Sequence, residues 1–266
     1  MAQDNVNEMQ QRLLAACTIA REAGALALNA FRNRPQGEAL IFKGPQDYLT
    51  ETDGQVEKLI RAGLTKSFPK DSFFGEEAGG DFGRDVWIVD PIDGTANFAR
   101  GIPHWCISIG FVRDRRSEIG VIYDPIHDEL YAARRGHGAF RNEAPIRVST
   151  TTDLARASVE FGWSSRLPAE PYAAIVLKLK QSGANVRRGG SGTLGLAYVA
   201  DGRSDAYGEL HINAWDVAAG LVLIEEAGGF VNDFFAGNGL TKGNPVLGCT
   251  PGLKDVMMRA VGLTTR

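Results

Sequence analysis

Asp90-Pro91-Ile92-Asp93-Gly94-Thr95-Ala96-Asn97-Phe98 is the stretch around which the chain is organised. The residues before it, Val-Trp-Ile-Val at 86–89, are typical of a buried β-strand, which brings Asp90 to the end of that strand. The proline and glycine of the stretch favour an immediate turn that places Asp93 and the Thr95 hydroxyl nearby. Two carboxylates with a backbone carbonyl between them are a ligand set for a hard cation such as Mg²⁺. The same acids could instead cap a turn or a helix.

Composition is that of an ordinary soluble globular protein. The 266 residues are 44% hydrophobic and 23% charged, which allows one large domain or two modest ones that share an interface. The net charge is −3 and no long basic run occurs, so we expect no nucleic-acid partner. We predict one domain over residues 1–266, with a metal-site half over about 1–150 and a second α/β half over about 151–266.

Cysteine usage and the N-terminus bear on the compartment. Cys17, Cys106 and Cys249 lie at unrelated spacings, which favours buried free thiols over a disulfide framework or a zinc site. Residues 1–5 lack a basic region followed by an apolar one, and no uninterrupted apolar stretch is long enough for a bilayer. The sequence therefore predicts a cytoplasmic protein without a membrane partner.

Apolar periodicity predicts two sheets interleaved with helices. Helical spacing predicts a helix over 9–31 and a second from Thr52 or Asp53 to Phe68. Beyond Phe98 the short apolar runs predict an antiparallel meander with strands at 106–112, 118–123, 129–133 and 138–141. The second half alternates, with strands at 158–161, 206–209, 230–231 and 245–249 and helices at 170–181, 194–200 and 215–227, before a final helix. This order predicts an α/β or α+β layered sandwich.

Further acidic residues occur at the boundaries of predicted elements. Asp53 lies near a helix start, Glu76 and Glu77 lie in a turn, and Asp216 lies in the first turn of a helix. A carboxylate near a helix N-terminus is favoured by the helix dipole alone, so a purely structural role for Asp53 and Asp216 stays open. Layered α/β folds commonly assemble sites from the ends of different elements. Spacing shows only that each acid is placed where convergence could occur.

Three motifs, in this order, resemble the signature of the inositol monophosphatase family. They are Gly-Glu-Glu at 75–77, the stretch 90–98, and Trp-Asp-Val-Ala-Ala-Gly at 215–220. Nearly the whole chain is covered, and one departure is Ala78, where many members carry a hydroxyl residue. The resemblance implies the layered αβαβα sandwich of the inositol monophosphatase and fructose bisphosphatase type. It also implies a Mg²⁺-dependent, lithium-sensitive phosphomonoesterase, commonly a homodimer.

The resemblance implies a site for two to three Mg²⁺ ions. The implied metal ligands are Glu76, Asp90, the Ile92 carbonyl, Asp93 and Asp216. Thr95, supported by Asp53, would orient the attacking water together with Glu76. Two cations that flank a phosphate stabilise both the attacking and the leaving oxygen. Water would then attack phosphorus directly, without a phosphoenzyme.

The resemblance also implies where the substrate binds. The implied substrate-binding residues are Asp93, Gly94, Thr95, Gly192, Thr193, Glu209 and Asp216. The amides of Gly94 and Thr95, at the start of a short helix, are placed to bind phosphate. Glu209 takes the position of a glutamate that hydrogen-bonds substrate hydroxyls, although a solvated carboxylate at a strand end is the alternative. Gly192 and Thr193 match a segment on the other side of the polyol.

Several alternatives remain open on the sequence alone. The first-choice substrate is myo-inositol 1-phosphate, but relatives with these motifs hydrolyse histidinol phosphate, fructose bisphosphate or nucleotide bisphosphates. Glu209 or Trp163 could receive the imidazole and amine of histidinol phosphate. A haloacid-dehalogenase-type phosphatase has one residue between its two acids, whereas two residues separate Asp90 and Asp93. Some bacterial relatives also resemble partners of the transcription machinery, so a binding role is a further alternative.

Overall fold

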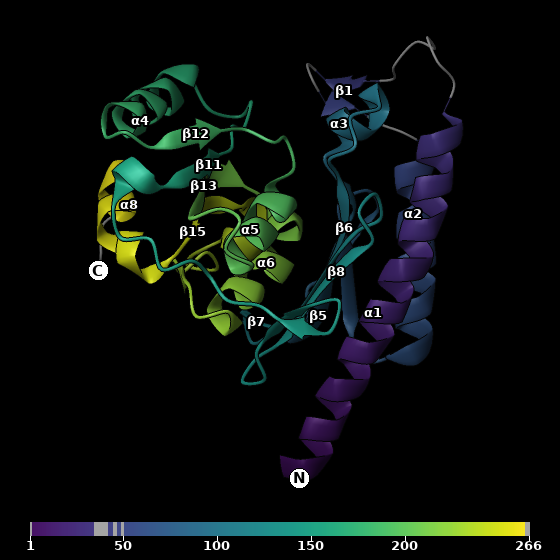
Figure 1. Cartoon of the computed structure of the whole chain (residues 1–266). Coiled ribbons are helices and arrows are strands. Elements are labelled where there is room, and N and C mark those ends of the chain that lie inside the picture. Colours follow the sequence, from purple (N-terminus) through teal and green to yellow (C-terminus); the bar gives the residue numbers. More distant parts are fainter. Residues whose placement is uncertain (1, 35–41, 45–46, 49–50, 264–266) are drawn as a thin grey trace.

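Five layers of helix and sheet stack in the computed structural model, which describes residues 2–34, 42–44, 47–48 and 51–263 (Figure 1). The outer layer α1 and α2 covers one sheet, α5 and α6 fill the space between the two sheets, and α4 and α8 cover the second sheet. These helices are α1 (Ala2–Asn33), α2 (Glu51–Ser67), α4 (Ala169–Gln181), α5 (Gly192–Ala200), α6 (Ala214–Glu226) and α8 (Lys254–Ala260). The predicted αβαβα sandwich is confirmed.

The first sheet joins eight strands of the described residues. Their spatial order is β10 (Ala144–Pro145), β9 (Ala139–Arg141), β8 (Glu129–Arg134), β7 (Arg116–Asp124), β6 (Cys106–Arg113), β5 (Asp85–Asp93), β3 (Ser72–Gly75) and β4 (Gly79–Gly80). Strands β5 to β9 pair antiparallel in sequence order, and the four strands from β6 to β9 confirm the predicted meander. Strand β3 runs parallel to β5, with Gly75 opposite Val89. Glu76, the residue that follows β3, therefore lies beside Asp90 of β5.

Strand β5 is buried on both faces, which explains its continuous apolar sequence. Val86 and Ile88 pack in the core cluster with α6, whereas Trp87 and Val89 pack in the cluster with α1 and α2. The strand is longer than predicted because Pro91 does not end it. The pairing register with β6 shifts between Asp90 and Asp93, and an irregularity of this kind accommodates a proline inside a sheet.

The turn instead comes at Gly94. This glycine has φ 94°, a left-handed conformation that side-chain-bearing residues rarely adopt, and it leads directly into α3 (Thr95–Arg100). Asp90 and Asp93 therefore both lie within β5, and Thr95 begins the next helix. Strand and turn together place the three polar residues of the stretch at one end of the sheet.

The second sheet joins five strands of the described part of the chain. Their order is β12 (Asn185–Arg187), β11 (Ser158–Phe161), β13 (Ala206–Ile212), β15 (Asn244–Cys249) and β14 (Phe230–Val231). Strand β11 is parallel to β12 and β13, and β15 is antiparallel to both of its neighbours. The sequence did not predict β12, because three residues without apolar alternation carry no strand signal. The remaining described elements include β1 (Phe42–Gly44), β2 (Asp47–Tyr48) and α7 (Gly239–Lys242).

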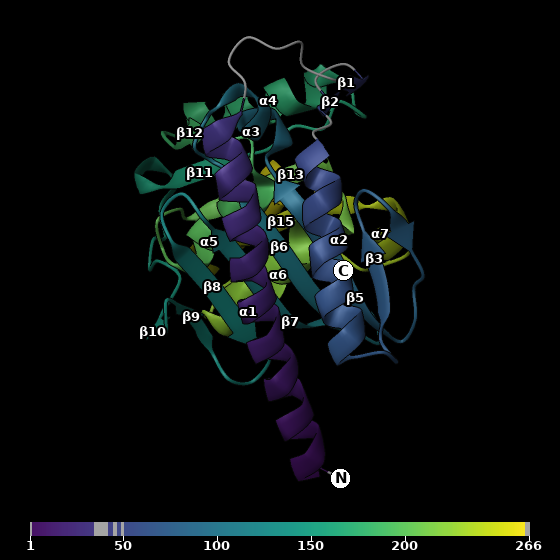
Figure 2. The ribbon, with the colours of Figure 1, turned by 90° about the vertical axis from the view of Figure 1, so that its right-hand side faces the viewer.

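Helix α1 lies beside α2 over the first sheet (Figure 2). Its small residues Ala16, Ala20, Ala23 and Ala27 are fully buried there, which lets the helix approach the sheet closely. Over Asn7–Asn33 it is also long and apolar enough, by length and composition, to cross a membrane. A core helix passes the same test, so this match is weak support for a membrane span. The absence of a membrane partner stays a prediction.

The structure tests two further predictions, the start of α2 and the state of the cysteines. Helix α2 begins at Glu51, so Asp53 lies in its first turn and the predicted start at Thr52 or Asp53 was slightly late. The three cysteines are free, as predicted, with Cys106 and Cys249 buried and Cys17 half-buried.

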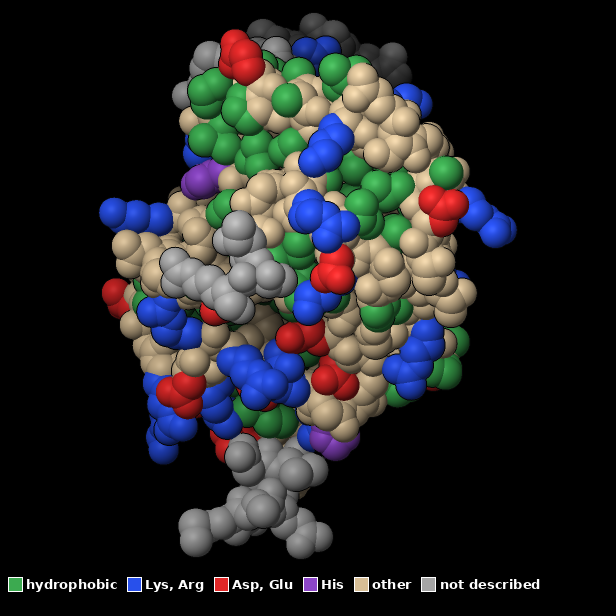
Figure 3. Space-filling view, turned by 90° about the vertical axis from the view of Figure 1, so that its left-hand side faces the viewer, with side chains coloured by type: hydrophobic (Ala, Val, Ile, Leu, Met, Phe, Trp, Pro, Cys, Tyr) green, Lys and Arg blue, Asp and Glu red, His purple; other side chains and the backbone are tan. Residues whose placement is uncertain are grey.

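The outer face near α4 and α8 is mixed in charge (Figure 3). Lys and Arg side chains lie among Asp and Glu side chains there, while hydrophobic side chains gather toward the upper part of the view. Leu177 on α4 is exposed. The visible face therefore carries neither a purely acidic nor a purely basic surface.

Candidate metal and substrate site

Three carboxylates from distant segments converge at the end of β5. One oxygen each from Asp90, Asp93 and Asp216 lies within 4.8 Å of the others. Asp90 and Asp93 come from β5, and Asp216 comes from the first turn of α6, which packs against the same sheet. Asp90 is only 1% exposed and Asp93 only 8%. The fold thus brings together acids that the sequence could only place at element ends.

Backbone geometry at the stretch 90–98 also joins Thr95 to Asp53. The Ile92 amide donates to Asp90 Oδ1 at 2.9 Å, which fixes that carboxylate against its own strand. The Thr95 hydroxyl lies 2.9 Å from the Ile92 carbonyl and 3.5 Å from Asp53 Oδ1. Asp53 is fully buried on α2. Thr95 therefore lies beside Asp53, the neighbour that the family resemblance implies for it.

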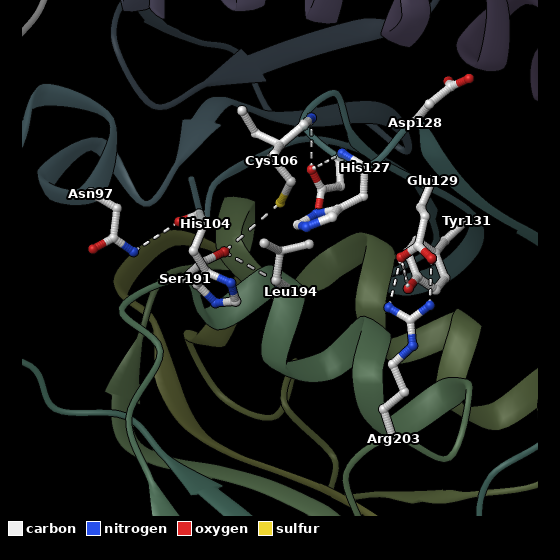
Figure 4. Close-up of polar contacts among 12 residues, drawn as sticks. Asn97, His104, Cys106, His127, Asp128, Glu129, Tyr131, Ser191, Leu194 and Arg203 are labelled. Carbon is white, nitrogen blue, oxygen red and sulfur yellow. Dashed lines mark hydrogen bonds and ion pairs between the residues drawn. The ribbon is translucent and has the colours of Figure 1, made fainter. Parts of the chain in front are cut away.

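A second layer of donors holds Asp93 from the other half of the chain. The Ser191 hydroxyl and the Thr193 amide, at 2.8 Å, both donate to Asp93 Oδ2. Ser191 also accepts from the Leu194 amide at 3.3 Å, and it faces Cys106 Sγ at 3.9 Å (Figure 4). Ser191 was not predicted as a site residue, because a serine before a helix is explained well enough as an N-cap.

Thr193, which the resemblance implies on one side of the polyol, is not exposed to the cavity. Its side chain is fully buried, and its hydroxyl donates to the Asp216 carbonyl at 2.6 Å. Gly192, in contrast, lines the cavity described below. A Cβ at Gly192 would lie 2.8 Å from the Tyr207 hydroxyl and 2.9 Å from Ile212 Cδ1. Glycine at this position therefore preserves the close packing of the cavity wall.

Asp216 both caps the start of α6 and belongs to the carboxylate cluster with Asp90 and Asp93. The Asn213 amide donates to Asp216 Oδ2 at 3.0 Å, an interaction that stabilises the start of α6. The structural role left open for this residue is thus real, and it holds the carboxylate in a fixed orientation toward Asp90 and Asp93.

The electrostatics of the cluster oppose full ionisation. Burial raises the pKa of Asp90 well above its ordinary value, and the charges of Glu76, Asp93 and Asp216 raise it further. Burial and the charges of Asp93 and Glu76 likewise raise the pKa of Asp216. For Asp93 burial raises the pKa, while donation from Ser191 and Thr193 opposes the rise. A hard divalent cation relieves such repulsion, so this all-oxygen donor set, with Asp90 and Asp93 buried and Asp216 half-buried, fits Mg²⁺.

A cavity of about 410 Å³ opens beside the cluster. Glu76, Asp93 and Asp216 line its acidic end. Glu209 and Trp163, which the sequence considered for the substrate, line it as well. This volume lies within the range of small-molecule binding sites.

Glu209 is buried in the cavity wall. Its side chain is 9% exposed, and Oε2 accepts from the Tyr207 hydroxyl at 2.7 Å. Burial raises the pKa of Glu209 to about 7, although Tyr207, Arg188 and Arg166 favour the charged form. A Cβ at Gly162 would lie 2.1 Å from Glu209 Oε2, so a glycine is needed opposite the carboxylate. These contacts exclude a solvated strand-end carboxylate.

Two arginines that were not predicted as site residues line the exposed part of the cavity. Arg166 follows β11 and Arg188 follows β12; both are exposed, and both line the cavity. Within the described residues neither side chain forms an ion pair. The buried carboxylate of Glu160 also lines the cavity and accepts from the Gly189 amide at 2.8 Å. In sequence the two arginines are indistinguishable from surface loop residues, because no motif surrounds them.

Asn97 ties the two halves of the chain together beside the site (Figure 4). Its Nδ2 donates to the His104 carbonyl at 2.8 Å and to the Gly189 carbonyl at 3.0 Å. Farther along, Arg203 Nη1 donates to Glu129 Oε2 at 2.7 Å, a second link between the halves in the same view. The Asn97 bond stabilises the position of the turn at Gly189 against α3, whereas the Arg203 bond links the segment after α5 to β8.

Comparisons with known proteins agree with this geometry. The sequence model described as "Inositol monophosphatase family" matches residues 8–261. A Xylella fastidiosa protein named "Nus factor SuhB" is 42% identical over 219 residues, covering 81% of this chain and 79% of its own length. Extragenic suppressor protein suhB from Bartonella henselae superimposes with a TM-score of 0.86 at 34% identity, over 94% of this chain and 98% of that one. Inositol monophosphatase from Anabaena gives 0.83 at 33% identity, over 97% and 98%.

Proposed function

The chain belongs to the inositol monophosphatase family, and from this premise we propose that it is a Mg²⁺-dependent phosphomonoesterase. Its substrate is a small phosphorylated alcohol, with myo-inositol 1-phosphate as the first choice. The observation that carries the proposal is the convergence of Asp90, Asp93 and Asp216 beside a cavity of suitable size. The chain would act in the cytoplasm as a lithium-sensitive homodimer, which light scattering and inhibition by Li⁺ would test.

The proposed metal ligands are those that the family motifs imply. They are Glu76, Asp90, the Ile92 carbonyl, Asp93 and Asp216, for two to three Mg²⁺ ions. When bound, these cations neutralise the phosphate and make water a stronger nucleophile near neutral pH. Asp53 orients the Thr95 hydroxyl, and this hydroxyl together with Glu76 orients the attacking water.

The remaining contacts would hold the ester in place. The amides of Gly94 and Thr95 donate to the phosphate, while Asp93 and Asp216 define the position of its oxygens. Gly192, backed by Thr193, lines the wall of the pocket, and Glu209 accepts hydrogen bonds from the alcohol. The carboxylate of Glu209 is already aligned by Tyr207, so it loses little freedom when substrate binds.

Glu209→Gln is expected to change substrate choice more than turnover. Above pH 7, where Glu209 is ionised, the substitution keeps the side-chain shape but replaces a charged acceptor. This costs about 1.5–3 kcal/mol for a hydroxyl that it binds, or roughly tenfold to a hundredfold in kcat/KM. Inositol 1-phosphate should lose this factor, whereas an aryl phosphate without alcohol hydroxyls should keep its kcat. Equal losses for both substrates would contradict the assignment of Glu209.

An activity panel with and without Mg²⁺ tests the function directly. It compares inositol 1-phosphate, histidinol phosphate and sugar phosphates, including fructose bisphosphate, by kcat/KM. We expect Mg²⁺-dependent hydrolysis with inositol 1-phosphate preferred. A large preference for histidinol phosphate would overturn the substrate choice, and no hydrolysis of any ester would overturn the phosphatase proposal.

The charged side chains of the cavity bear on two alternative substrates, histidinol phosphate and fructose bisphosphate. The carboxylates of Glu160 and Glu209 suit the cationic amine of histidinol phosphate, whereas Arg166 and Arg188 at the rim oppose a cation and favour a second anionic group. Apart from its phosphate, inositol 1-phosphate carries neither a cationic amine nor a second anionic group. Its hydroxyls can hydrogen-bond both to carboxylates and to arginines.

A second candidate function is a role with the transcription machinery. It is favoured by the name "Nus factor SuhB" that the Xylella relative bears. Such a role would use the surface rather than the acidic cluster, so an inactive Asp93→Asn variant should retain it. Co-elution of the purified chain with RNA polymerase, compared between wild type and this variant, measures the interaction. Failure of both to co-elute would count against the second role.

A further inference from the structure

Glu57 lies outside the three motifs. Its buried carboxylate accepts hydrogen bonds from the turn that follows Glu76. It lies on α2 and is 2% exposed. Its Oε2 accepts from the Glu77 amide at 2.7 Å, and its Oε1 accepts from the Ala78 amide at 3.0 Å. These two amides directly follow Glu76 in the chain. A single side chain therefore fixes the backbone on one side of a proposed metal ligand.

Arg61, one helical turn further along α2, contacts both Glu57 and the same turn. Its Nη2 lies 3.3 Å from Glu57 Oε1 and donates to the Gly79 carbonyl at 2.7 Å. The guanidinium lies 4.2 Å from the ring centroid of Phe73. The buried charge of Glu57 is thus compensated by two amides and one guanidinium, which is the condition for a stable buried carboxylate.

Gly75 provides the space for this arrangement. A Cβ built on Gly75 would lie 2.3 Å from Glu57 Oε2 and 2.4 Å from its Cδ. The glycine is therefore required by close approach of the carboxylate. On the other side, the Glu76 amide donates to the Val89 carbonyl of β5 at 3.1 Å. The backbone of Glu76 is held between α2 and the strand that carries Asp90.

The same face of α2 supports the other catalytic segment. Asp53 lies four residues before Glu57, a spacing that places both side chains on one face of a helix. Asp53 faces the Thr95 hydroxyl at 3.5 Å, while Glu57 holds the turn of Glu76. One rigid helix therefore sets the separation between the two segments.

We propose that Glu57 is a positioning residue that sets the Mg²⁺ affinity of the site through Glu76. This inference rests on the proposed function, in which Glu76 is a metal ligand. Groups that orient metal ligands typically change metal affinity by about 10–100-fold when they are removed. Glu57 does not contact the reacting atoms, so its loss weakens metal binding and leaves the chemical step largely intact once Mg²⁺ is saturating.

Glu57→Gln tests the proposal, because an amide keeps the volume but offers only one acceptor to two adjacent N–H donors. We expect the Mg²⁺ concentration for half-maximal activity to rise about 10–100-fold, with kcat at saturating Mg²⁺ largely retained. Calorimetric titration with Mn²⁺ should show the same loss of affinity without turnover. In the metal-free protein, the Glu77 and Ala78 amides should exchange hydrogen faster than in wild type.

Glu51→Gln is the matched control, since Glu51 is an exposed carboxylate on the same helix that contacts Gln55. It should change neither metal affinity nor amide exchange. Gly75→Ala should reproduce the Glu57→Gln defect, and the double variant should be no worse than either single one, because both disturb one contact. Should Glu57→Gln fail to fold, Glu57→Asp, which is too short for both amides, serves in its place.

The outcomes separate this inference from the proposed function. Unchanged Mn²⁺ affinity in Glu57→Gln, or a kcat loss that saturating Mg²⁺ does not restore, would overturn the positioning role. Failure of the wild type to bind Mn²⁺ would overturn the proposed function. In that case the exchange rates of the two amides would still show whether Glu57 holds the turn.

Discussion

Asp93→Asn is expected to lower kcat by about 10²–10⁴-fold at saturating Mg²⁺, since a bound cation supplies several kcal/mol of transition-state stabilisation. The substitution removes one ligand charge from the cluster but keeps the side-chain volume. The asparagine can still accept from the Ser191 hydroxyl and the Thr193 amide, so the fold should persist. Steady-state kinetics over a Mg²⁺ series measures the effect.

The same variant should be more stable than wild type when no metal is present. The pKa values of Asp90, Asp93 and Asp216 are raised in the folded protein. Their protonated forms are therefore favoured by folding at acidic pH, and this stability is lost as pH rises from the ordinary carboxyl range through the raised pKa values. Near neutral pH the cluster is destabilising, and removing one charge relieves it.

Thermal unfolding with and without Mg²⁺ checks this expectation. Wild type should gain Tm on addition of Mg²⁺, and metal-free Asp93→Asn should have a higher Tm at pH 7 than metal-free wild type but gain little from Mg²⁺. Asp81→Asn, at an exposed carboxylate outside the cluster, is the control and should behave as wild type. Normal turnover in Asp93→Asn at saturating Mg²⁺ would contradict the ligand assignment.

Thr95→Val should lower kcat by roughly 10²–10⁴-fold, the usual contribution of a positioned proton-transfer group. Valine keeps the branched shape at the first position of α3 but cannot hydrogen-bond to the Ile92 carbonyl or to Asp53. The attacking water then loses the hydroxyl that orients it. Because the carboxylates are untouched, Mg²⁺ affinity should stay within a few-fold of the wild-type value.

This split between kcat and metal affinity separates Thr95 from the proposed ligands. Calorimetric Mn²⁺ titration gives the affinity, and single-turnover hydrolysis gives the chemical step. Thr18→Val, on α1 and remote from the cavity, is the control for loss of a threonine hydroxyl. A kcat for Thr95→Val within about threefold of wild type would lie far below the general acid–base range and would contradict the role.

Most of the fold could be predicted from the sequence because its elements have strong local signals. The apolar run before Asp90 predicts a strand that is buried on both faces, and the short runs after Phe98 predict a meander. Strand β12 had no such signal, since its position is set by parallel pairing with β11. Pro91 was misinterpreted as a strand end because proline favours turns, whereas here a register shift accommodates it.

Some residues of the candidate site could likewise be predicted from the sequence, and others could not. Its acids could be named in advance because three motifs resemble a known family, but their proximity depends on α6 packing against the first sheet. Ser191 and Glu57 could not be found, since a serine before a helix and a glutamate inside one are common for other reasons. Their importance comes from what they contact across 98 and 20 residues of sequence, respectively.

Anomalous diffraction from a crystal soaked in Mn²⁺ shows whether the three converging acids bind a cation, because Mn²⁺ takes the same oxygen ligands as Mg²⁺. Anomalous peaks are expected at the end of β5, within coordination distance of the carboxylates of Asp90, Asp93 and Asp216. Those oxygens should be the ligands of at least one ion. An empty cluster, or Mn²⁺ bound only elsewhere on the protein, would contradict this expectation.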